Sequence, residues 1–189
     1  MKWSILIPSL IERENLLNRL LNILNTQIKE CNAENEVEIL VLTDNREQST
    51  GTKRNRLIQM ANGEYLCFFD DDDVPENNYI KLVLEAVEQS PDVIPINGYI
   101  TIRGANPTYW QMGLEYERKT ITNCMGQVEH YEAPPNHLAV MKKCLMKDYL
   151  FQDISWAEDS EWADRLKNDK VFKTQVRIKQ PIYHYVFTK

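Results

Sequence analysis

Short apolar runs alternate with helical repeats through the first hundred residues, and this alternation restricts the possible folds more than any other feature. The apolar runs are typical of buried strands and cover residues 3–8, 37–42, 65–69 and 93–102. Apolar residues at helical spacing lie between them, up to about residue 30, before Gly63 and over residues 80–87. Because parallel strands need crossover connections, this βαβαβαβ order predicts an α/β fold with a mainly parallel sheet flanked by helices on both faces.

The second half of the chain has a weaker pattern. Residues 103–135 are aromatic and polar without a strand or helix period, so we expect an irregular segment there. The remaining elements are expected as a strand at 137–141, a helix over about 158–168 and two terminal strands at 171–178 and 181–187. With no linker or internal repeat, we predict a single domain, 1–189, with an α/β half at 1–102 and a smaller mixed half at 103–189.

Charge and composition exclude several classes of protein. The chain has 28 Asp and Glu against 22 Lys and Arg, a net charge of −6, which argues against nucleic acid as a partner. No apolar run approaches the roughly 18 residues of a transmembrane segment, and residues 4–10 are too short for a secretory signal. The four cysteines form no C-x-x-C pair. We therefore expect a cytoplasmic protein, either free or peripheral to a membrane.

Four consecutive aspartates, Asp70 to Asp73, directly follow the apolar run at 65–69. Ligands of open parallel sheets bind at the carboxyl ends of the strands, and carboxylates suit Mg²⁺ or Mn²⁺ bound together with substrate phosphates. The run therefore predicts a divalent metal site, with capping of the following helix as the alternative. An EF-hand calcium loop is excluded, because its sixth and twelfth positions would be Pro75 and Leu82.

The other two strand runs also end in polar residues. The first continues as Pro8-Ser9-Leu10-Ile11-Glu12 and the second as Thr43-Asp44-Asn45. Neither end contains a glycine-rich phosphate-binding pattern, so a diphosphate would be neutralised by metal and side chains rather than by backbone N–H groups. Asp44 is suited to accept a hydrogen bond from a nucleobase, and a turn-forming role is equally open.

Taken together, these segments resemble the family 2 glycosyltransferases of GT-A fold. The resemblance is carried by IPSLIEREN, VEILVLTDN, GTKRNRLIQMANGEYLCFFDDDDVP and AEDSEWADR, and covers residues 3–90 and a stretch around 137–166. It implies a Rossmann-like sheet with a nucleotide-sugar-binding half at 1–102 and an acceptor-side half at 103–189. Two features depart from the family pattern. Asp44-Asn45-Arg46 replaces the usual Asp-Gly-Ser, and no Q-x-x-R-W follows Glu158-Asp159, which favours a non-processive enzyme.

The resemblance also implies a role for individual residues. Donor binding is assigned to Pro8, Ser9, Glu12, Asp44, Arg54, Asp70 and Asp71. The metal, Mn²⁺ or Mg²⁺, is assigned to Asp72 with Asp70, and Asp159 beside Glu158 is the expected general base. His184, in a tyrosine-rich terminal strand, is a further candidate metal ligand, with a packed or surface position as the alternative. The expected donor is a UDP-sugar, and the expected acceptor is a glycan, lipid-linked or protein-linked hydroxyl.

The residue types also suit sugar transfer on chemical grounds. The glycosidic bond breaks through an oxocarbenium-like transition state, a cation offsets the charge on the leaving diphosphate, and a carboxylate on the opposite face takes the acceptor proton. This chemistry predicts a metal-dependent inverting transferase. The helix start lowers the pKa of Asp159, whereas Glu158 and Glu161 raise it, so the net shift stays open.

Two other functions are alternatives to glycosyl transfer, and two tryptophans are candidates for acceptor binding. A sugar-phosphate nucleotidyltransferase would need a glycine-rich loop after the first strand, and a non-catalytic metal-dependent carbohydrate-binding module would leave Asp159 without a purpose. Trp156 and Trp162 flank the Glu158-Asp159 pair, where an aromatic face suits stacking on an acceptor sugar, although core packing is the commoner fate of tryptophan.

Overall fold

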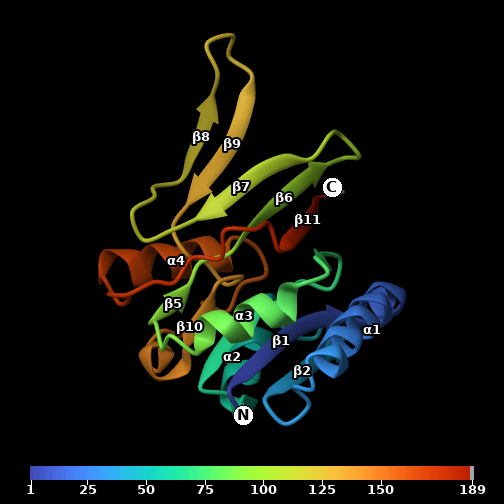
Figure 1. The fold of residues 1–189 in the computed structure, drawn as a ribbon. Coiled ribbons are helices and arrows are strands. Elements are labelled where there is room, and N and C mark those ends of the chain that lie inside the picture. Colours follow the sequence, from blue (N-terminus) through green and yellow to red (C-terminus); the bar gives the residue numbers. More distant parts are fainter. Residues whose placement is uncertain (188–189) are drawn as a thin grey trace.

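The computed structural model describes residues 1–187. It contains two sheets, and the first belongs to the α/β half of the fold. Its strand order is β2-β1-β3-β10-β5, with β1, β2 and β3 parallel and β10 antiparallel to both of its neighbours (Figure 1). Its strands are β1 (Trp3–Leu10), β2 (Val37–Asp44), β3 (Tyr65–Phe68), β5 (Val93–Ile94) and β10 (Val140–Lys142). The expected α/β architecture is therefore confirmed, with an antiparallel strand at one side of the parallel core.

Helices cover both faces of this sheet because each buries an apolar stripe. The helices are α1 (Glu14–Glu30), α2 (Thr50–Met60), α3 (Tyr79–Val87) and α4 (Glu158–Asn168), with short 3₁₀ turns at Ile11–Arg13 and Lys143–Met146. In α1 the buried residues include Leu17, Leu20 and Leu24, at the spacing that the sequence predicts. Helices α1 and α3 pack against each other, whereas α2 packs on β1 and β2 and contacts α4. No helix within residues 1–187 combines the length and apolarity needed to cross a membrane.

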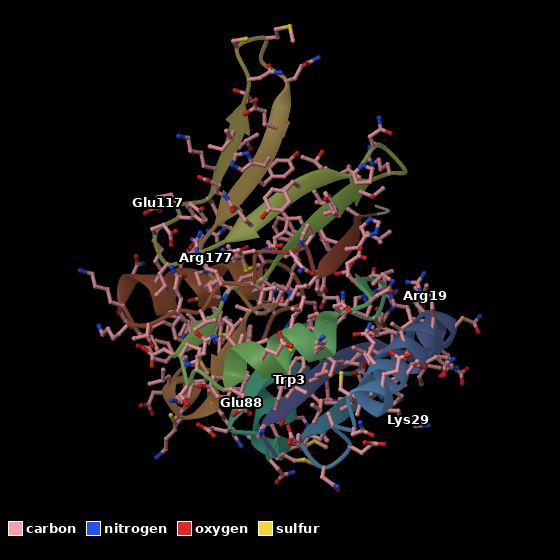
Figure 2. All side chains as sticks on the ribbon, in the orientation of Figure 1. Trp3, Arg19, Lys29, Glu88, Glu117 and Arg177 are labelled. Atoms are coloured by element: carbon pink, nitrogen blue, oxygen red, sulfur yellow. The ribbon has the colours of Figure 1, made fainter. Side chains whose placement is uncertain are left out.

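The second sheet replaces the irregular segment that we expect over residues 103–135. Its order is β4-β11-β6-β7-β9-β8, and it contains β4 (Val74–Pro75), β6 (Asn97–Ile102), β7 (Thr108–Met112), β8 (Lys119–Thr122), β9 (Val128–Ala133) and β11 (Tyr183–Phe187). The β8–β9 hairpin stands away from the body, with side chains on both faces reaching solvent (Figures 1 and 2). Neither β8 nor β9 contains a fully buried side chain, so these strands lack a clear apolar alternation, and the sequence prediction was wrong for them.

Two further strand predictions are corrected. Residues 93–102 form two strands in different sheets, β5 and β6, instead of one. Residues 171–178 form no strand, because the Asp92 carboxylate accepts hydrogen bonds from the backbone N–H groups of Lys173 and Thr174, and only a single bridge joins Val93 to Gln175. The terminal strand is confirmed as β11, which runs parallel to β6 and antiparallel to β4.

A chain of buried aromatic rings joins the two sheets. The ring of Trp3 on β1 (Figure 2) lies 5.5 Å from that of Tyr79, and the Phe69 ring lies 5.4 Å from Tyr79 and 4.4 Å from Tyr183 of β11. Trp110 of β7 continues the contact, 5.9 Å from Tyr183. The aspartate run lies between β3 in the first sheet and β4 in the second, so this packing holds it at the junction of the sheets.

Candidate active site

A cavity of about 740 Å³ lies at this junction, where the carboxyl ends of β1 and β3 face the second sheet. Of the residues predicted for the site, it is lined by Pro8, Ser9, Arg54, Asp70, Asp71, Asp72, Glu158 and Asp159. Side chains from β7, β9 and β11 form the opposite wall. Segments far apart in the sequence therefore contribute to one concave site, as ligand-binding sites of this size commonly require.

Arg54 lies at the buried base of the cavity between two carboxylates. Its Nη2 is 3.2 Å from Asp70 Oδ1 and its Nε is 3.3 Å from Glu158 Oε1. The guanidinium carbon lies 4.8 Å from the centre of the Phe68 ring and 5.6 Å from that of Phe151. The Nη1 group is buried without a hydrogen-bond partner. Arg54 thus joins the end of β3 to the start of α4, and its Nη1 group remains available to donate a hydrogen bond to a ligand.

His137 bridges the two carboxylates that the sequence assigns to opposite sides of the reaction. Its side chain is 7% exposed, with Nε2 3.4 Å from Asp70 Oδ2 and Nδ1 3.3 Å from Asp159 Oδ2. The Nδ1 contact is an ion-pair distance without hydrogen-bond alignment. The backbone of His137 is fixed to the aspartate-bearing strand, because its carbonyl accepts the Phe68 N–H at 2.9 Å.

These contacts keep both carboxylates ionised. Burial raises the pKa of Asp159, but contact with His137 and the charge of Arg54 outweigh it and bring the pKa down to about 2. Burial likewise opposes ionisation of Asp70, yet Arg54 and His137 hold its pKa well below the ordinary range. For His137, burial and Arg54 lower the pKa, but Asp70 and Asp159 outweigh them and raise it. The site therefore favours an imidazolium between two carboxylates.

Asp71 and Asp72 share one cation, Arg13. Arg13 Nη1 lies 2.7 Å from Asp71 Oδ1 and 3.2 Å from Asp72 Oδ2, and Asp71 Oδ2 accepts the Ser9 hydroxyl at 2.6 Å. Burial raises the pKa of Asp72, and the charges of Asp70 and Asp71 raise it further against the opposing effect of Arg13. Asp72 is thus short of positive charge, and an added cation would stabilise its ionised form.

Asp73 belongs to the scaffold rather than to the cavity. Its carboxylate is fully buried and accepts hydrogen bonds from the Tyr183 hydroxyl at 2.6 Å and from the Val186 N–H at 2.8 Å. Burial, together with the charge of Asp70, raises its pKa to about 8. The fourth aspartate therefore joins the aspartate run to β11.

Three predicted site residues lie outside the cavity lining. Asp44 is buried against Lys53, whose Nζ lies 2.7 Å from Asp44 Oδ1 and donates to the Ser9 carbonyl at 2.8 Å. The Asp44 carboxylate also accepts hydrogen bonds from the backbone N–H groups of Gln48 at 2.8 Å and Arg46 at 3.3 Å, as its turn-forming alternative predicts. Burial raises the pKa of Asp44, but Lys53 and these N–H groups outweigh burial and lower it. Glu12 forms an ion pair with Arg46, which does line the cavity.

The third residue outside the lining is His184. Its Nε2 lies 2.7 Å from Thr101 Oγ1 of β6, and the residue does not belong to the cavity lining that includes Asp72. Within residues 1–187 there is no group of three or more His, Cys, Asp or Glu side chains arranged as a metal site. Asp70 and Asp72 both line the cavity, and an ion held by them would take its other ligands from the substrate and water.

The sequence alone did not show which basic side chains contact the predicted carboxylates. Lys53 lies in the GTKRN segment and fills the space around Asp44, and Arg13 directly follows Glu12. His137 is different, because its place after Pro134-Pro135-Asn136 and before a strand makes it a candidate for the acceptor side, with a structural role favoured. That turn signal does not say which groups face the ring. Only the pairing of β10 with β3 brings His137 to the aspartates.

The two-sheet α/β fold, with carboxylates and basic side chains lining a cavity at the carboxyl ends of its parallel strands, is consistent with the GT-A class of transferase folds. Residues 36–145 match the family model described as glycosyl transferase family 2, which is more than half of the chain, and the chain therefore belongs to this family. A search of curated protein sequences found no match.

Solved structures show the same fold at low sequence identity. The crystal structure of Staphylococcus aureus TarS 1–349 in complex with UDP-GlcNAc matches with a TM-score of 0.67 and 18% identity, over 100% of this chain and 59% of that chain. The complex of the same protein with UDP gives 0.68 and 18%, over 98% and 60%. The catalytic domain of Drosophila β1,4-galactosyltransferase 7 in complex with xylobiose gives 0.57 and 16%, over 97% and 70%. The chain thus spans about three-fifths of the TarS 1–349 structures.

Proposed function

We propose that the chain acts as a non-processive, inverting glycosyltransferase that moves a sugar from a UDP-sugar to an acceptor hydroxyl, with Mn²⁺ or Mg²⁺ as cofactor. The observation that carries the proposal is the buried sequence of contacts Glu158–Arg54–Asp70–His137–Asp159 in one cavity. Membership of glycosyl transferase family 2 supports the transfer reaction. The UDP-GlcNAc and UDP bound to TarS, a protein of the same fold, favour a uridine nucleotide as donor.

On the donor side, the available charges suit a diphosphate and a divalent cation. Arg54 keeps a buried N–H group without a partner, and Arg13 and Lys53 add positive charge to the lining. Asp72 has a raised pKa among like charges, so a cation there relieves repulsion that Arg13 offsets only in part. Asp72 and Asp70 would hold the metal, which when bound offsets the charge developing on the leaving diphosphate.

On the acceptor side, we assign Asp159 as general base. Its carboxylate is ionised at neutral pH, because its pKa is held at about 2, and 29% of its side chain is exposed. A carboxylate with so low a pKa is a weak base, so we expect it to take the hydroxyl proton late, once the new C–O bond has made that proton acidic. Attack from the face opposite the diphosphate inverts the anomeric carbon.

A panel of UDP-sugars with Mn²⁺ or Mg²⁺, read as release of UDP, tests this proposal. Asp159→Asn should abolish transfer while UDP binding is retained, and Asp164→Asn, an exposed carboxylate on the same helix paired with Arg118, is the matched control and should keep full activity. Retained turnover in Asp159→Asn would exclude this residue as base. Pyrophosphate release from UTP and a sugar phosphate, without UDP release, would instead indicate a nucleotidyltransferase.

A further inference from the structure

Trp156 is the one tryptophan of the chain that the fold leaves in solvent. Its side chain is 86% exposed, whereas Trp3 and Trp162 are fully buried and Trp110 is 9% exposed. Trp156 lines the cavity that also contains Asp159, only three positions further along the chain. Burial of a tryptophan stabilises a fold more than burial of most residues, so core packing does not explain a tryptophan at this position.

The segment before Trp156 is attached to the N-terminus of α2 and does not hang free. The attachment consists of hydrogen bonds from Gly51 N to Ile154 O (3.0 Å), Thr50 N to Ser155 Oγ (3.3 Å), Ser49 Oγ to Asp153 Oδ1 (2.6 Å) and Thr52 Oγ1 to Asp153 Oδ1 (2.7 Å). The approach at Gly51 is so close that a Cβ there would lie 1.8 Å from the Gln152 carbonyl oxygen. The exposed ring therefore extends from a backbone that is held in place.

The residue after Trp156 turns the chain sharply. Ala157 has φ 61° and ψ 13°, a left-handed conformation that is unfavourable for any residue with a Cβ. This turn lets Glu158 enter the buried contact with Arg54 while the preceding Trp156 faces solvent. Strained backbone persists where the surroundings enforce it, and such positions gather at functional sites.

We propose that Trp156 is the platform on which a sugar ring of the acceptor stacks, so that the acceptor is itself a carbohydrate. The inference rests on the proposed transfer reaction for its choice of the acceptor side. Although its segment is attached to the N-terminus of α2, Trp156 itself lies three positions before Asp159, the proposed base of the acceptor side. Pyranose rings expose a face of C–H groups, and an indole covers such a face with a large rigid surface while neighbouring polar groups bind the hydroxyls.

The experiment compares wild type, Trp156→Ala and Trp156→Phe, with Leu150→Ala as the matched control. Leu150 is 51% exposed in the same segment and lies outside the cavity lining. The first quantity is hydrolysis of UDP-sugars in water. The second is KM for a panel of disaccharides of glucose, galactose and N-acetylglucosamine, compared with serine peptides and simple alcohols. The third is disaccharide binding, measured by calorimetric titration with UDP and Mn²⁺ present.

We expect a disaccharide to be the preferred acceptor and Trp156→Ala to raise its KM by about tenfold or more, with partial recovery in Trp156→Phe. Leu150→Ala should match wild type in donor hydrolysis and in acceptor KM, and both Trp156 variants should change the donor KM less than the disaccharide KM. An unchanged disaccharide KM in Trp156→Ala, a rise confined to the donor KM, or preference for peptides or simple alcohols would overturn the proposal. If no UDP-sugar is turned over, the transfer reaction fails. Disaccharide binding that still depends on Trp156 would then support the sugar platform without the transfer reaction. If no such binding is found, both the platform and the transfer reaction are refuted.

Discussion

His137 carries a quantitative prediction, because its contact is the main effect that lowers the pKa of Asp159, with a smaller contribution from the charge of Arg54. The pKa of this carboxyl lies at about 2 against an ordinary value of 3.8, a difference of nearly two pKa units. Each unit corresponds to about 1.4 kcal/mol, so loss of the imidazolium in His137→Gln should cost about 2 kcal/mol of unfolding free energy. For a domain of this size, that is a fall of about 4–8 °C in Tm.

The predicted cost depends on pH in a definite direction. The pKa of His137 is raised, so its ion-pair contribution is present below its unfolded pKa of about 6.5 and is lost as pH rises through the higher folded value. The lowered pKa of Asp159 adds stability above about pH 4, which is lost only as pH falls toward 2. The difference in Tm between wild type and His137→Gln should therefore be largest near pH 5 and small near pH 9.

Thermal unfolding followed by circular dichroism at pH 5, 7 and 9, without added metal, measures this difference. His130→Gln is the control, because His130 lies on the β8–β9 hairpin beside Glu132 and outside the cavity lining, so its Tm should change by less than about 2 °C. A deficit in His137→Gln that is equal at all three pH values would mean that the ring acts by packing alone. The His137 imidazolium would then contribute no ion-pair stability.

Three further substitutions test the geometry around the site by thermal unfolding and acceptor kinetics. Ala157→Gly relieves the left-handed backbone and should raise Tm by about 1–4 °C, because the gain of about 1–2 kcal/mol is offset only in part by the entropy of glycine. Gly51→Ala forces a Cβ against the Gln152 carbonyl, so it should lower Tm and raise the acceptor KM; an unchanged KM would separate that segment from acceptor binding. Arg54→Ala leaves the buried Glu158 without a cation and should cost about 3–5 kcal/mol, and a loss below about 1 kcal/mol would contradict the buried ion pair.

The parts of the fold that could be predicted have strong local signals. The apolar runs of β1 and β3 and the leucine spacing of α1 follow from burial on one or both sides, and each appears within a short window of sequence. The aspartate run and the Glu158-Asp159 pair lie at a strand end and a helix start, positions that the same windows define. Parallel topology predicts a ligand site at the aspartate run, whereas the expected place of Glu158-Asp159 in the same site comes from the family resemblance.

The parts that could not be predicted depend on contacts between distant segments. Asp159 starts a helix beside other acids, and these neighbours alone leave the direction of its pKa shift open. The contact with His137, 22 positions earlier in the chain, lowers the pKa. Asp44 accepts a hydrogen bond from Lys53, which no turn propensity foresees. Residues 171–178 have apolar side chains at strand-like spacing, yet the Asp92 side chain satisfies part of their backbone instead of a neighbouring strand.

We propose that Asp72 and its neighbours hold a divalent cation that in turn holds the diphosphate of a uridine nucleotide. Calorimetric titration of UDP into wild type, Asp72→Asn and Asp164→Asn, each with and without Mn²⁺, measures this dependence on the metal. Mn²⁺ should lower the Kd for UDP at least about tenfold in wild type and Asp164→Asn, and should have no such effect in Asp72→Asn. Equal UDP affinity with and without Mn²⁺ in wild type, or full enhancement in Asp72→Asn, would show that Asp72 holds no such cation.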